Sequence, residues 1–181
     1  RIGLLNRKNT SAEIKWFDID PCFIFHPVNA FEDAAGNVVF DAMRYQRIFD
    51  QDWNGPFTES PPLLTRWQLD ISKGTAAEQQ LDDRPAEFPR IHPSLEGREH
   101  RFGYALGLGK SSVKPEFSSI IKYDFTQNSS EVHELGADKM GAEPVFVPVE
   151  QAESEDQGYL LSYVFDRRDN KSSLLILNAQ D

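Results

Sequence analysis

The stretch Gly103-Tyr104-Ala105-Leu106 returns as Gly158-Tyr159-Leu160-Leu161, 55 residues further along the chain. Two other pairs of matching positions are 56 residues apart, Trp67 with Tyr123 and Glu87 with Glu143. Three markers that agree within one residue indicate an internal repeat. A repeat of this length, with about four strands in each unit, is typical of a β-propeller blade.

Between these markers the sequence is a series of short apolar or alternating runs separated by turn-forming residues. Such runs predict strands, and no window sustains the apolar stripe of an amphipathic helix. We therefore predict an all-β fold, with residues 1–181 forming a single partial propeller domain of about three blades. The expected repeat units are 20–86, 87–142 and 143–181. Because the sequence begins at Arg1 and ends just after the apolar run 174–177, we expect the N- and C-terminal parts of the propeller to be missing from it.

The charge of the chain excludes one class of partner. The 181 residues carry a net charge of −10, and no block of basic residues could neutralise a phosphate backbone, so no nucleic-acid partner is expected. Arg98, His100 and Arg101 form a local basic cluster flanked by acidic residues, which we interpret as solvated loop charges.

Cys22 is the only cysteine, so no internal disulfide can form. A reducing compartment and a cytoplasmic location fit this composition. No apolar run approaches the roughly 18 residues that a spanning helix needs, which leaves peripheral contact with a membrane open.

The segment 22–33, Cys-Phe-Ile-Phe-His-Pro-Val-Asn-Ala-Phe-Glu-Asp, is the candidate for the chemistry. His26 follows an apolar run that favours a packed strand, and Pro27 can neither donate to a ladder nor let His26 enter a helix. We therefore expect the imidazole to be held rigidly and to point one way. The alternative for a lone histidine is a core residue that is hydrogen-bonded to the backbone.

The repeat gives this histidine acidic neighbours. In a propeller the first strand of each blade lines the central channel, so equivalent positions in successive blades converge on the axis. Glu87 and Glu143 are equivalent by their spacing, and His26 lies about one unit earlier. The two carboxylates could bind iron, manganese or calcium directly, or they could accept a hydrogen bond from the outer N–H of histidines that bind the metal. The residues themselves leave both interpretations open.

The segment Phe25-His26-Pro27-Val28-Asn29-Ala30-Phe31-Glu32 resembles a motif of the carotenoid cleavage oxygenase family, which includes lignostilbene dioxygenases and the visual-cycle retinoid isomerase. The segments 87–91 (Glu-Phe-Pro-Arg-Ile) and 143–148 (Glu-Pro-Val-Phe-Val-Pro) look like two further motifs of that family, and the similarity covers most of the chain from Trp16 onward. The resemblance implies a seven-bladed propeller with four histidines around one iron(II) ion.

By this resemblance His26 is one of the iron ligands and Glu87 accepts a hydrogen bond from it, while Glu143 supports a later histidine beyond Asp181. The other three ligands would then lie outside this chain, two before Arg1 and one after Asp181, and the segment alone is expected to bind iron poorly. The remaining histidines match no ligand motif, and we expect them to be surface or packing residues: His92, His100 and His133.

The resemblance also implies an activity, the cleavage of a conjugated C=C bond of a carotenoid, apocarotenoid or stilbene by O₂ to give two carbonyl products. Phe23, Phe25, Phe31 and residues of the loop 45–62 are candidates for the walls of an apolar substrate tunnel, with core packing as the alternative. Two other hypotheses remain: a non-catalytic propeller that acts as a binding module or scaffold, and an isomerase or hydrolase on the same iron scaffold. The sequence indicates no particular oligomeric state.

Overall fold

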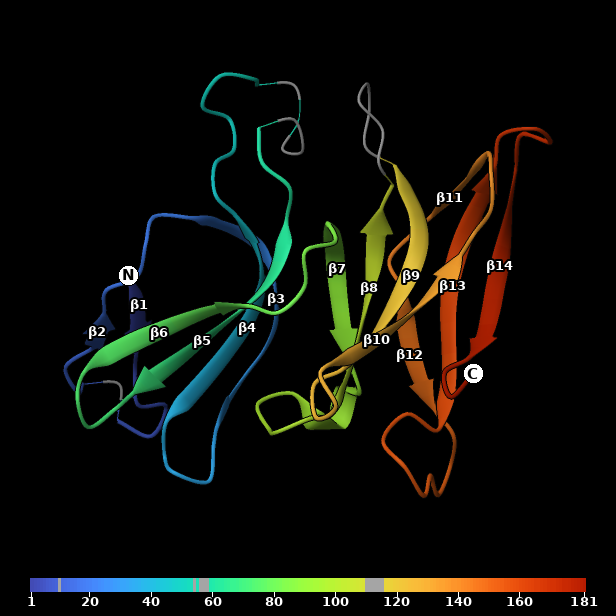
Figure 1. Ribbon diagram of the computed structural model, residues 1–181. Coiled ribbons are helices and arrows are strands. Elements are labelled where there is room, and N and C mark those ends of the chain that lie inside the picture. Colours follow the sequence, from blue (N-terminus) through green and yellow to red (C-terminus); the bar gives the residue numbers. More distant parts are fainter. Residues whose placement is uncertain (10, 54, 56–58, 110–115) are drawn as a thin grey trace.

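Three antiparallel sheets of four strands follow one another along the part of the chain that the computed structural model describes, residues 1–9, 11–53, 55, 59–109 and 116–181. Figure 1 shows these sheets standing side by side, with a small two-stranded ribbon at the N-terminal end. The helical content of the described residues is one short 3₁₀ turn, η1 (Pro93–Leu95). The prediction of an all-β fold is confirmed.

Each sheet is built from strands that are neighbours in sequence. The N-terminal ribbon pairs β1 (Ile2–Leu4) with β2 (Lys15–Phe17). The first sheet consists of β3 (Phe23–Glu32), β4 (Val38–Tyr45), β5 (Leu63–Asp70) and β6 (Thr75–Gln80), in that order. The second consists of β7 (Ala86–Ile91), β8 (Phe102–Leu108), β9 (Phe117–Asp124) and β10 (Ser129–Glu134). In the third, β11 (Lys139–Gly141) and β12 (Val145–Pro148) share one edge of β13 (Gly158–Asp166), and β14 (Lys171–Asn178) pairs with the other edge.

One edge strand from each of the three sheets meets the next. Strand β3 contacts β7, and β7 contacts β12. The three strands line a common groove of about 650 Å³, whose walls include Pro27, Val28, Pro89, Arg90, Val145 and Phe146. Sheets that bring one edge strand each to a common axis in this way are blades of a β-propeller, so the chain forms part of one. The sheets divide the chain between β6 and β7 and between β10 and β11, whereas the expected units divided it at 86/87 and 142/143.

The repeated glycines have a steric cause. Gly103 is the second residue of β8, and Gly158 is the first residue of β13. A Cβ atom at Gly158 would lie 2.4 Å from the carbonyl oxygen of Val147, and one at Gly103 would lie 2.9 Å from the ring of Phe125. Only glycine allows such close packing, which explains why the residue recurs at this point of the repeat.

The core lies between the sheets. Met43 and Leu64 of the first sheet pack against Ala105 and Ile121 of the second, and a further cluster joins the second sheet to the third. Strand β8 is buried along its whole length because it has a sheet on each side. Each large side chain buried in this way contributes about 1.5–3 kcal/mol. By contrast, Tyr163, Leu174 and Ile176 of the third sheet are exposed in the described chain.

Asn29 fastens the first sheet to the loop that follows β7. Its Oδ1 accepts a hydrogen bond from the backbone N–H of Gly97 at 2.9 Å. Its Nδ2 lies 2.9 Å from the carbonyl oxygen of Arg98, 3.2 Å from that of Leu95 and 3.1 Å from Nδ1 of His100. The buried amide thus satisfies backbone groups of a loop about 70 residues further along the chain.

The interpretation of His100 as a solvated loop charge is wrong. His100 is buried, with its ring packed edge-on against Phe31 and Phe125. Burial lowers the pKa of His100 below its usual 6.5, so the ring is a neutral packing residue and not a solvated charge. Arg101, in contrast, remains partly exposed and pairs with Asp124.

Within the described ranges, no helix has the length and apolar character that crossing a membrane requires.

Candidate metal centre

His26 lies on β3 within the first of two irregularities of the strand. The pairing register with β4 shifts between Ile24 and Pro27 and again between Pro27 and Asn29. Pro27 has no N–H to offer the ladder, and a bulge of this kind re-aims a neighbouring side chain. The imidazole remains 41% exposed on the side of β3 that faces β7.

Glu87 on β7 is the partner of this imidazole. Its Oε2 lies 2.7 Å from Nδ1 of His26, and its side chain is only 2% exposed. The same oxygen accepts the backbone N–H of Phe88 at 2.9 Å. Strand β7 also has a register shift, between Glu87 and Arg90, which turns the carboxylate toward the first sheet. The structure therefore brings together His26 and Glu87, two of the three residues that the repeat placed near a common axis.

The hydrogen bond determines what the imidazole can do. A carboxylate only accepts, so the neutral ring carries its proton on Nδ1 and keeps a lone pair on Nε2. Among the described residues no hydrogen bond reaches that Nε2 atom. A neutral imidazole with a carboxylate behind it is the usual form of a metal-binding histidine. His26 fits an iron ligand, and the buried Glu87 fits the hydrogen-bonded support better than a direct ligand.

Tyr45 stands behind the carboxylate. It is fully buried on β4, and burial together with the nearby negative charge of Glu87 raises its pKa. The Oε1 atom of Glu87 is buried as well. Tyr45 stands 42 residues before Glu87, at the start of the loop proposed for tunnel walls, and no motif indicated its position next to this carboxylate.

Glu143 pairs with a residue other than His26 in the described part of the chain. Its Oε1 forms an ion pair with Nε of Arg90 at 2.7 Å, and both side chains are partly exposed. The structure therefore brings His26 and Glu87 into contact and places Glu143 against a basic residue of β7. Among the described residues, no group of three or more His, Cys, Asp and Glu could hold a metal, so this part of the chain supplies His26 as a single candidate ligand.

The three candidate tunnel phenylalanines have different surroundings. Phe23 and Phe25 are partly exposed, with ring centroids 4.8 Å apart, and the Phe25 ring is 6.3 Å from that of His26. Phe31 is buried on β3, five residues after His26, and its ring packs against that of His100. Phe88, which the sequence analysis did not single out, has its ring centroid 4.8 Å from that of His26.

The histidines at positions 92 and 133 take no part in the contact between His26 and Glu87. His92 caps η1, where its Nδ1 accepts the backbone N–H of Ser94, and His133 is exposed on β10. Both positions agree with the expected surface or packing role, since the half-buried ring of His92 also lies 5.3 Å from that of Phe146.

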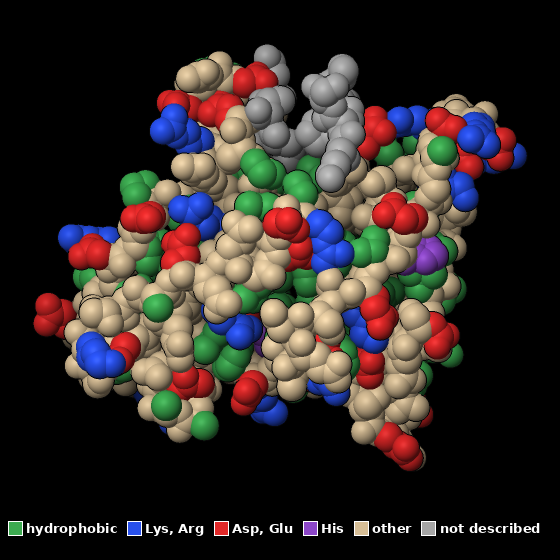
Figure 2. Space-filling model, viewed as in Figure 1, with side chains coloured by type: hydrophobic (Ala, Val, Ile, Leu, Met, Phe, Trp, Pro, Cys, Tyr) green, Lys and Arg blue, Asp and Glu red, His purple; other side chains and the backbone are tan. Residues whose placement is uncertain are grey.

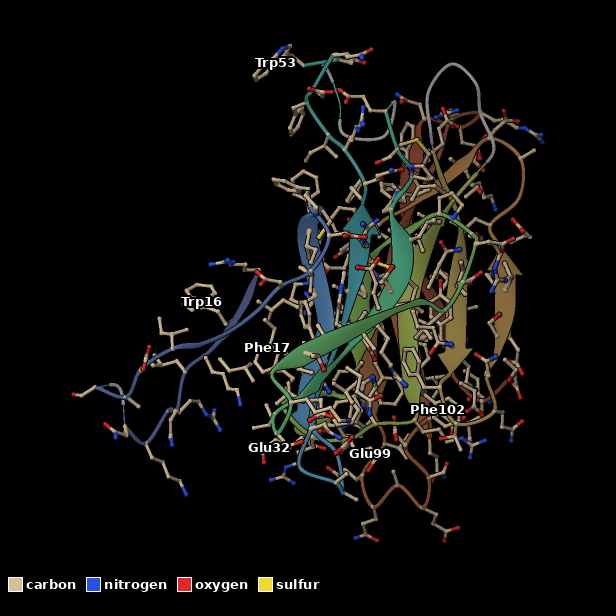
Figure 3. All side chains as sticks on the ribbon, turned by 60° about the vertical axis from the view of Figure 1, so that its left-hand side comes forward. Trp16, Phe17, Glu32, Trp53, Glu99 and Phe102 are labelled. Atoms are coloured by element: carbon tan, nitrogen blue, oxygen red, sulfur yellow. The ribbon has the colours of Figure 1, made fainter. Side chains whose placement is uncertain are left out.

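The described residues of the loop 45–62 extend beyond the first sheet at the end where β4 finishes. In Figure 3, Trp53 stands at this end, and Glu32 and Glu99 lie at the opposite one. Trp53 is 81% exposed. Residues 54 and 56–58 of the loop fall outside the described residues. On the face shown in Figure 2, acidic and basic side chains are interspersed, without a continuous basic surface.

Together, the blades and the histidine–glutamate pair on their first strands define a β-propeller with a candidate metal site where those strands meet. The whole chain, residues 1–181, matches the model of the family described as retinal pigment epithelial membrane protein. The chain belongs to this family, which is that of the carotenoid cleavage oxygenases.

Individual relatives agree with the family model. The chain is 36% identical to a carotenoid cleavage oxygenase of Mycobacterium tuberculosis over 187 residues, which cover 99% of this chain and 37% of that protein. It is 30% identical to the apocarotenoid-15,15'-oxygenase of Synechocystis, over 94% of this chain and 36% of that one. The crystal structure of cobalt-substituted Synechocystis ACO superposes with a TM-score of 0.84 over the same shares. The chain thus spans little more than a third of the length of these relatives.

Proposed function

We propose that the full-length protein is an iron(II)-dependent dioxygenase that cleaves a conjugated C=C bond of a carotenoid, apocarotenoid or stilbene. Both atoms of O₂ end in the two carbonyl products, so the reaction consumes one O₂ per bond cleaved. The observation that carries the proposal is the 2.7 Å contact between Nδ1 of His26 and the buried carboxylate of Glu87. The names of the relatives support the same class of reaction.

The residues of this chain would hold and orient the metal. Nε2 of His26 would be one ligand, and the hydrogen bond to Glu87 would fix its tautomer and raise its basicity. When bound, the iron supplies the chemistry that lets O₂ react with an alkene. We propose that the remaining ligands come from the parts of the full-length protein beyond the region matched here.

The aromatic residues beside the site would accommodate the substrate. Phe23 and Phe25 form an apolar surface next to the imidazole, and such a surface suits a neutral polyene or stilbene and excludes water. No side chain has to act as a nucleophile, because the protein only has to orient the metal, O₂ and the double bond.

The iron content of the full-length protein tests the proposal. The wild type should contain about one iron per chain and should take up O₂ with a model apocarotenoid or stilbene. His26→Ala should lose most of the iron, while His133→Ala, which changes an exposed histidine of β10, should keep it. A wild-type protein without iron would refute the proposal. A scaffold propeller would show a change in stability but not in metal content, and an isomerase or hydrolase would convert its substrate without O₂ uptake.

We also propose a cytoplasmic location with peripheral membrane contact, from which an apolar substrate would be extracted. The exposed Trp53 supports this, because tryptophan favours the interface between lipid and water. Co-sedimentation with phosphatidylcholine vesicles should fall for Trp53→Ala. Trp16→Ala, at the exposed tryptophan of the N-terminal ribbon, is the matched control.

A further inference from the structure

Phe88 has a backbone conformation that its side chain disfavours. Its φ is +54°, in the left-handed region, although it lies within strand β7. The other described residues with positive φ that are not glycine all lie in turns or bends outside the strands: Phe49, Asn128, Asp138, Gln151 and Asn170. A bulky aromatic residue with positive φ inside a strand is an outlier, and it persists only where its surroundings enforce it.

The strained residue touches both members of the candidate metal site. Its backbone N–H donates to Oε2 of Glu87 at 2.9 Å, the same oxygen that accepts from His26. Its ring centroid lies 4.8 Å from that of the imidazole, with an angle of 39° between the ring planes. On its other side the ring packs edge-on against Phe117 at 5.3 Å. Phe88 therefore binds the carboxylate of Glu87 through its backbone N–H and packs against the imidazole of His26 with its ring.

The contact between the two rings depends on this unusual φ. The register shift between Glu87 and Arg90 places the bulge at Phe88 and Pro89. The φ of a residue sets the direction of its own side chain relative to the preceding peptide, so the left-handed conformation determines where the ring of Phe88 lies relative to Glu87 and to the imidazole that Glu87 binds. Glycine would adopt this conformation more easily, but it would leave the imidazole uncovered.

We propose that Phe88 is a positioning residue: its strained backbone is retained because it places the ring against the imidazole of His26, while its N–H holds the carboxylate that fixes the tautomer of His26 for metal binding. The inference rests on the proposed function, in which His26 binds the metal. It assigns no contact between Phe88 and the metal. Its effect passes through the histidine and the glutamate.

Three variants of the full-length protein separate positioning from packing. Phe88→Gly relieves the backbone and removes the ring, Phe88→Ala removes the ring and keeps the strain, and Phe88→Leu keeps apolar bulk without the flat ring. The first readout is the titration of metal-free protein with Co²⁺, followed by visible absorption. We expect Co²⁺ to bind on the order of tenfold or more weakly to Phe88→Gly, in the range seen for other residues that support a metal ligand. We also expect Phe88→Gly to unfold at a higher temperature than Phe88→Ala, because glycine accepts the positive φ.

The second readout needs no metal. The ring nitrogen chemical shifts of His26 in the metal-free protein should show one tautomer in the wild type, with the proton on Nδ1, and a mixture of tautomers in Phe88→Gly. If Phe88→Gly keeps both the wild-type Co²⁺ affinity and the single tautomer, the positioning role is wrong. If instead the wild type binds no metal and His26→Ala changes nothing, the proposed function fails, and the tautomer measurement still decides whether Phe88 orients the imidazole.

Discussion

The side-chain amide of Asn29 and Nδ1 of His100 lie 3.1 Å apart, so the strand that carries His26 is fastened to a buried histidine 71 residues later. The amide also holds the backbone of the loop between them, through Gly97 and Arg98. This contact lies three residues from His26 along β3. The stability of the loop and the position of the candidate ligand are therefore linked.

Replacement of Asn29 tests this link. Asn29→Ala removes the partner of several buried backbone groups at once, and each such group left unsatisfied costs about 1–3 kcal/mol. We expect the free energy of unfolding to fall by about 2–4 kcal/mol in urea titrations. Asn178→Ala, at an exposed asparagine of β14, should change it by less than about 0.5 kcal/mol. Equal effects of the two variants would contradict the role of Asn29.

The burial of His100 predicts a dependence of stability on pH. Its pKa is lowered in the folded protein, chiefly by burial and also by Arg66, against the opposing influence of Asp41 and Glu155. At a pH between the folded value and 6.5 the unfolded chain binds more protons at this residue. The favourable contribution is therefore complete above pH 6.5 and is lost progressively as the pH falls toward the folded value.

His100→Gln tests whether His100 causes this pH dependence, since the amide oxygen of glutamine can accept a hydrogen bond from Asn29 but does not titrate. Urea titrations between pH 7.5 and 5 should show a smaller loss of stability in the variant than in the wild type. An identical pH profile for both proteins would show that other groups cause the loss.

The ion pair of Asp41 and Arg66 should contribute strongly to the first sheet. Asp41 is fully buried and accepts two hydrogen bonds from Arg66, each at 2.8 Å, which raises the pKa of the guanidinium. Asp41→Asn leaves the guanidinium of Arg66, which is 27% exposed, without its charged partner, and the free energy of unfolding should fall by about 1–3 kcal/mol. The pair of Arg1 and Asp18, in which both side chains are exposed, provides the control, and Asp18→Asn should leave thermal unfolding nearly unchanged.

Glu87→Gln should weaken metal binding without unfolding the protein. Glutamine keeps the shape of the side chain but loses the charge that favours an N–H on Nδ1 of His26. The iron affinity of the full-length protein should fall about 10–100-fold, measured by competition with a chelator. Glu131→Gln, at an exposed glutamate of β10, should bind iron as the wild type does. A normal affinity in Glu87→Gln would leave the hydrogen bond to His26 without a function in metal binding.

The short strands and the repeat were sufficient to predict the fold class, because a unit of this length with about four strands is typical of a propeller blade. The repeat also placed His26 and Glu87 near a common axis, but the specific pairing of the two was implied only by the resemblance to the family. The burial of His100 could not be predicted, since Arg98 and Arg101 on either side of it suggest a solvated loop. The positive φ of Phe88 was also hidden, because it arises from a bulge that depends on the pairing with β8.

The imidazole of the candidate site belongs to the first sheet and its carboxylate partner to the second. Neither sheet by itself contains both the imidazole and the carboxylate that fixes its tautomer. The candidate site therefore forms only when the two sheets pack together. An ion bound there would in turn hold the sheets together by mass action, and chelation should make the junction between β6 and β7 easier to cleave with a protease.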